Sequence, residues 1–77
     1  MVIKVLGSGC ANCNRLEERV REALARLGRD DEVVHVSDIA EIMRYGVMST
    51  PALVVDEEVR LAGRVPSVED LMALLSR

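Results

Sequence analysis

Two cysteines, Cys10 and Cys13, lie between two stretches of different hydrophobic pattern. Val2 to Leu6 is a short, almost continuously apolar run, which is typical of a buried strand in a parallel sheet. Asn14 to Leu27 carries apolar residues at helical spacing. The segment between them begins with a glycine-containing turn. The sequence therefore predicts a strand, a turn and a helix whose first turn carries the Cys-x-x-Cys motif.

This position favours reactive thiols. A helix N-terminus presents unpaired backbone N–H groups and the positive end of the helix macrodipole. Both stabilise a thiolate relative to a thiol, so a cysteine there becomes a better nucleophile at neutral pH. The rest of the chain is expected to form a scaffold for this dithiol.

The segments after the first helix continue the alternation of strands and helices. Glu32 to Val36 is β-branched and predicts a second strand, parallel to the first, with a right-handed crossover through the helix. Asp38 is expected to cap a short helix that ends at Gly46, with Glu41 completing a capping box.

Two strands and a helix are expected to complete the chain. Residues 52–55 and 59–62 are joined by a short acidic turn, so they are expected to form an antiparallel hairpin. Ser67 is expected to cap the last helix, with Asp70 three residues later. The predicted order is β-α-β-α-β-β-α.

Composition narrows the class of protein. With 77 residues, the chain is expected to form a single domain over residues 1–77. Its net charge of −3 and its single aromatic residue, Tyr45, argue against a nucleic-acid partner. It has no apolar run of the ~20 residues that a membrane span requires, and no signal-peptide pattern, so we expect a cytoplasmic protein. Cytosolic thiols stay reduced, which favours catalytic, redox-sensing or metal-binding cysteines over a structural disulfide.

The element order, with Cys-x-x-Cys opening the first helix and Thr50-Pro51 before the third strand, resembles the thioredoxin/glutaredoxin fold. Residues 7–13, 45–54 and 62–67 are similar more narrowly to the small redox-active-disulfide proteins, which are glutaredoxin-sized members of that superfamily. The resemblance implies an α/β fold with a four-stranded mixed sheet in the order 2-1-3-4, flanked by three helices.

The resemblance also implies an activity and a site. Cys10 would be the attacking thiolate and Cys13 the resolving one. Pro51 would follow a cis peptide bond and face the dithiol, Thr50 would pair with an extended substrate, and Gly63 would keep the groove open. The implied function is a thiol–disulfide oxidoreductase without a cofactor. Its partners would be a disulfide-containing protein or a low-molecular-weight thiol, and an upstream reductase.

The sequence departs from the thioredoxin pattern, and two alternative functions stay open. Ala11-Asn12 separates the cysteines, no tryptophan precedes them, and no carboxylate counterpart is evident beneath Cys13. The same thiolates would also suit a soft-metal or metalloid carrier, or a redox-switched interaction module without catalysis. A tetrahedral zinc site needs further ligands, and the only histidine, His35, is expected to have no ligand role. Tyr45 and Met48, near the Thr50-Pro51 turn, are expected to pack in the core.

Overall fold

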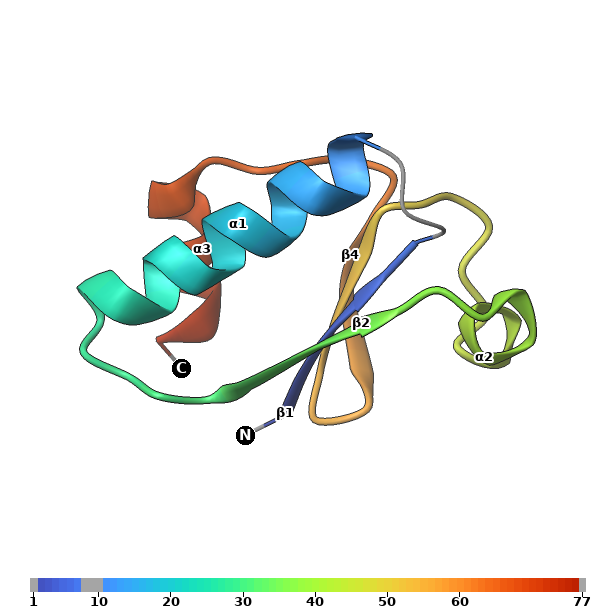
Figure 1. The fold of residues 1–77 in the computed structure, drawn as a ribbon, viewed down its shortest axis with the longest axis horizontal. Coiled ribbons are helices and arrows are strands. Elements are labelled where there is room, and N and C mark those ends of the chain that lie inside the picture. Colours follow the sequence, from blue (N-terminus) through green and yellow to red (C-terminus); the bar gives the residue numbers. More distant parts are fainter. Residues whose placement is uncertain (1, 8–10, 77) are drawn as a thin grey trace.

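The computed structural model describes residues 2–7 and 11–76. The elements follow the predicted order along the chain (Figure 1): β1 (Val2–Leu6), α1 (Ala11–Arg26), β2 (Glu32–Val36), α2 (Ile39–Arg44), β3 (Ala52–Val55), β4 (Glu58–Ala62) and α3 (Val68–Leu75). The four strands form one sheet in the order β2-β1-β3-β4. β1 runs parallel to β2 and antiparallel to β3, and β3 pairs antiparallel with β4. The predicted mixed sheet and its strand order are confirmed.

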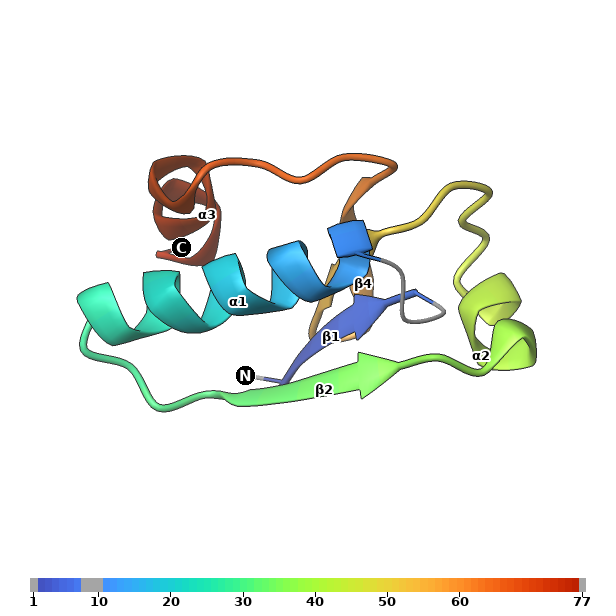
Figure 2. The same cartoon turned by 45° about the horizontal axis from the view of Figure 1, so that its top comes forward.

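The larger core lies between the sheet and the two longer helices. Figures 1 and 2 show α1 and α3 side by side, over the same side of the sheet. The apolar stripe of α1 is fully buried there, as the helical spacing of Leu16 and Val20 predicts. Leu71 and Leu75 of α3 pack into the same cluster. This packing fixes α1 on the sheet, and with it the first turn that carries Cys13.

A smaller core lies on the opposite face of the sheet. Ile42 of α2 packs there with Leu6, Ala52 and Val54. In Figure 2, α2 lies at the end of the sheet where β1 and β2 finish, on the other side from α1 and α3. The sheet is therefore covered on both faces, and this agrees with the continuous burial of β3.

Both predicted helix caps are present, but one of them uses a different backbone amide. The Ser67 hydroxyl accepts a hydrogen bond from Asp70 N at 3.1 Å, as in the predicted cap of α3. The Asp38 carboxylate also caps α2, but it accepts from Ala40 N at 2.9 Å, not from Glu41 N. An aspartate at the N-cap can satisfy either of these early amides.

No helix in the described part of the chain has the length and apolar character needed to span a bilayer.

Candidate functional site

The described part of the predicted dithiol is Cys13, on the first turn of α1. Its side chain is 0% exposed. α1 has no acidic residue in its first turn, so no carboxylate there offsets the positive end of the helix macrodipole. Cys10, the predicted attacking thiolate, lies outside the described residues, together with Ser8 and Gly9.

Gly7 allows the Cys13 sulfur to lie directly against the backbone that follows β1. A side-chain carbon attached to Gly7 would lie 2.0 Å from Cys13 Sγ and 4.0 Å from Thr50 Cβ. The first distance is far inside van der Waals contact, so only glycine fits this position. The end of β1, the start of α1 and the segment before β3 therefore come close together at Gly7.

The segment before β3 is connected to the segment after β4. The peptide bond between Thr50 and Pro51 is cis. Pro51 is buried and Thr50 is exposed. Gly63 N donates a hydrogen bond to Pro51 O at 2.8 Å, and a side-chain carbon on Gly63 would lie 3.0 Å from Ser49 Cβ. Gly63 also has φ +79°, a conformation that favours glycine. The structure thus places Thr50 beside Gly7 and Cys13, and Gly63 beside Pro51.

A polar pair that the sequence analysis did not anticipate adjoins this site. His35 Nδ1 lies 2.8 Å from Glu17 Oε1, and His35 Nε2 lies 3.1 Å from Gly7 O. Glu17 follows Cys13 by four residues, which places both on one side of α1, one turn apart. The four-residue spacing could have shown from sequence that Glu17 lies near Cys13. That His35 lies near Glu17 depends on the position of β2 relative to α1, which the spacing does not give.

A second polar group joins three elements on the opposite face of the sheet. Lys4 Nζ donates to Tyr45 OH at 2.8 Å and to Glu57 Oε1 at 2.7 Å, and Tyr45 OH donates to Glu57 Oε2 at 3.0 Å. The hydrogen bonds to Glu57 and Tyr45 raise the pKa of Lys4 above its usual value. A lysine held in its ammonium form is a poor nucleophile, and the hydrogen bonds of this cluster link β1 to the β3–β4 turn.

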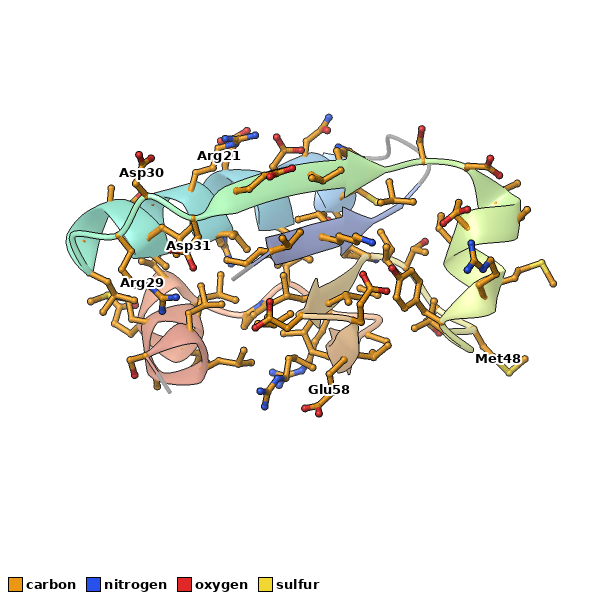
Figure 3. All side chains as sticks on the ribbon, turned by 90° about the horizontal axis from the view of Figure 1, so that it is seen from below. Arg21, Arg29, Asp30, Asp31, Met48 and Glu58 are labelled. Atoms are coloured by element: carbon orange, nitrogen blue, oxygen red, sulfur yellow. The ribbon has the colours of Figure 1, made fainter. Side chains whose placement is uncertain are left out.

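Of the two residues expected in the core near the Thr50-Pro51 turn, one is there. Tyr45 packs against the smaller core cluster. The expectation for Met48 is wrong, because its side chain is 99% exposed. Figure 3 shows Met48 extending into solvent at the end of the molecule opposite Arg29 and Asp31. Met48 lies in the loop between α2 and β3, where no core cluster of the described residues includes it, so its apolar character gave the wrong prediction.

Among the residues that the structure describes, histidine, cysteine, aspartate and glutamate side chains form no group of three or more that could hold a metal ion.

Comparison with known proteins relates this arrangement to one family. Residues 1–76 match the family model described as "Thioredoxin domain". A thioredoxin from Methanothermobacter thermautotrophicus is 41% identical over 76 residues, which is 99% of this chain and 99% of that protein. A thioredoxin from Methanocaldococcus jannaschii is 39% identical over 71 residues, which is 92% of this chain and 81% of that protein. The similarity extends over nearly the whole fold.

Proposed function

Because this chain belongs to the thioredoxin family, we propose that Cys10 and Cys13 exchange a dithiol for a disulfide with protein or small-molecule disulfides. The Cys10 thiolate attacks one sulfur of the substrate disulfide, and the other substrate sulfur leaves as a thiolate. Cys13 then attacks Cys10, which forms the Cys10–Cys13 disulfide and releases the second substrate thiolate. The dithiol loses two electrons and the substrate gains them.

The burial of Cys13 is the observation that carries this assignment of roles. A sulfur that is 0% exposed and packed against Gly7 has no access for a protein disulfide. It is suited to attack a neighbouring sulfur of its own chain, which is the task of the resolving cysteine. The cysteine that meets the substrate must then be Cys10.

The substrate is proposed to lie beside Thr50 and Gly63, with the buried Pro51 beneath them. Thr50 and Gly63 are exposed, and Gly63 is joined to Pro51 by a backbone hydrogen bond. An extended segment of a partner could pair with backbone groups there, as in other cases of strand addition. An upstream reductase or a low-molecular-weight thiol restores the dithiol, and the cytosol is the compartment in which such thiols are abundant.

A matched pair of serine variants tests this proposal. The probe is an aromatic disulfide, the bis(nitrobenzoate), because each cleavage releases a coloured thiolate. Reduced wild-type protein should release two thiolates in sequence. Cys13→Ser should release one and retain the other half of the reagent as an adduct that mass spectrometry detects. Cys10→Ser should release none, because Cys13 is buried.

Two results would contradict the proposal. Release of both thiolates by Cys13→Ser would show that Cys13 does not resolve the mixed disulfide. Stoichiometric binding of a soft metal ion by the wild-type protein, without cleavage of the probe, would instead indicate a metal carrier.

A further inference from the structure

His35 lies on β2, the edge strand next to β1, and its side chain faces α1. It pairs in register with Val5, which belongs to the core beneath α1 and α3. Neighbouring residues in register point to the same face of a sheet, so His35 reaches the same side. There its ring lies between Glu17 of α1 and the carbonyl oxygen of Gly7.

Both ring nitrogens of His35 face groups that accept hydrogen bonds. The Gly7 carbonyl can only accept, so Nε2 must carry a hydrogen. Glu17 also receives hydrogen bonds from Arg21, at 3.2 Å from Nε and 3.0 Å from Nη2 to Oε2. Partial burial alone would raise the pKa of Glu17, but the bonds from Arg21 and His35 outweigh it, and this pKa lies below its usual value.

Both polar groups of Gly7 are held by β2. Its N–H donates to Val36 O at 2.9 Å, and its carbonyl accepts from His35. The Cys13 sulfur packs against the same glycine, and Glu17 is one turn further along the helix that carries Cys13. The contact with His35 therefore links the backbone on one side of the sulfur to the helix on the other.

We propose that His35 is a positioning residue for the dithiol: bridging Glu17 and the Gly7 carbonyl, it fixes Gly7 and the adjoining Cys13 sulfur in the position from which Cys13 attacks the mixed disulfide. This rests on the proposed thiol–disulfide exchange. On α1, the charged groups facing the ring are Glu17 and, behind it, Arg21. The ionisable side chain of β1, that of Lys4, lies on the opposite face with Tyr45.

The first test measures the hydrogen bonding of the His35 ring nitrogens directly and needs no substrate. The chain has one histidine, so its ring nitrogens can be followed by nitrogen NMR without assignment ambiguity. We expect the Nδ1 signal to change in Glu17→Gln, because an amide replaces the carboxylate that faces Nδ1. An Nδ1 signal that Glu17→Gln leaves unchanged would overturn the proposal.

The second test measures the release of the second coloured thiolate from the aromatic disulfide, which reports the attack by Cys13. A reacting atom that is displaced attacks more slowly, so Glu17→Gln and His35→Gln should slow this step about threefold or more. The first release should keep its rate, whereas a general loosening of the fold would slow both releases.

Glu22→Gln is the matched control. Glu22 lies on the same helix and pairs with Arg26 at 2.6 Å, away from the dithiol, so both releases should keep their wild-type rates. Equal slowing of both releases in Glu17→Gln, or no slowing of the second, would overturn the proposal. If circular dichroism shows that His35→Gln does not fold, the release rates of Glu17→Gln decide whether the proposal holds. Absence of any thiolate release from the wild-type protein would overturn the proposed function, while the ring measurement would still report the state of His35.

Discussion

At Gly7 the backbone passes so close to the Cys13 sulfur that no side chain fits between them. A side-chain carbon there would lie 2.0 Å from Sγ and 2.9 Å from Cβ of Cys13. Rotation of the Cys13 side chain would move Sγ, but Cβ is fixed to the helix backbone, so the clash with Cβ can be relieved only by moving the first turn of α1 or the end of β1. Gly7 thus controls where the Cys13 sulfur lies.

We expect Gly7→Ala to lower the free energy of unfolding by about 1–3 kcal/mol, the usual range for overpacking a filled interior. It should also change the rate of the second thiolate release, because the sulfur is displaced. Urea unfolding and the aromatic disulfide assay measure the two effects.

Gly28→Ala separates this clash from backbone strain. Gly28 has φ +69° and nothing within 4 Å of its missing side chain. Alanine there should cost about 1–2 kcal/mol through the left-handed backbone alone. It should leave both thiolate releases unchanged. Wild-type stability and wild-type release rates in Gly7→Ala would contradict the role given to this glycine.

At the scale of elements, the contact between α1 and β2 depends on the ionised carboxylate of Glu17. The pKa of Glu17 is lower in the folded protein than its ordinary value of 4.5, although partial burial opposes this, because Arg21 and His35 donate hydrogen bonds to it. The unfolded chain therefore binds more protons at acid pH. The stabilisation is complete above about pH 4.5 and is lost as the pH falls through the lower, folded value.

Glu17→Gln should therefore unfold with a shallower acid dependence than the wild-type protein below pH 4.5. Part of the dependence should remain, since hydrogen bonds from Lys4 and Tyr45 also lower the pKa of Glu57 on the other face of the sheet. Urea unfolding at a series of pH values gives the two slopes. Identical slopes would mean that Glu17 is as easily protonated in the folded state as in the unfolded one.

The elements themselves could be predicted from sequence because their signals are local. Helical spacing, β-branched runs and the Ser67 cap each depend on residues within one or two turns of chain, and the structure confirms them. The pair of His35 and Glu17 could not be predicted in this way, because it depends on how far α1 is displaced along β2. Met48 was mispredicted for a similar reason: hydrophobicity indicates a preference for burial, but the path of its loop decides exposure.

The candidate site could be predicted in part. The family resemblance predicts Thr50, Pro51 and Gly63 near the dithiol. The structure places Thr50 near Gly7 and Gly63 beside Pro51, and the roles of these residues stay predictions. Residue types and spacing alone would have given only the Cys-x-x-Cys motif at a helix N-terminus. The role of Cys10 stays a prediction.

At the scale of the whole molecule, a chain of this length has a small free energy of unfolding. At about 0.05–0.15 kcal/mol per residue, a protein of this length is stable by only about 4–12 kcal/mol. The dithiol helix α1 is held between the sheet and α3, and the leucines of α3 provide much of that contact. Weakening the α1–α3 packing should therefore affect the stability of the whole fold.

Two leucines of α3 test this. Leu71 is 0% exposed, whereas Leu74 is only partly buried at the edge of the same core. Leu71→Ala should lower the free energy of unfolding by about 2–5 kcal/mol, since a buried leucine leaves a cavity when truncated, and this is a large fraction of the total. Leu74→Ala removes the same atoms from a site that water already reaches, so its loss should be clearly smaller. If both variants unfold with the same dependence of free energy on urea concentration, the difference between their urea midpoints gives the difference in stability. Equal midpoints would show that α3 does not depend on its buried side, and that α1 is held in place by the sheet alone.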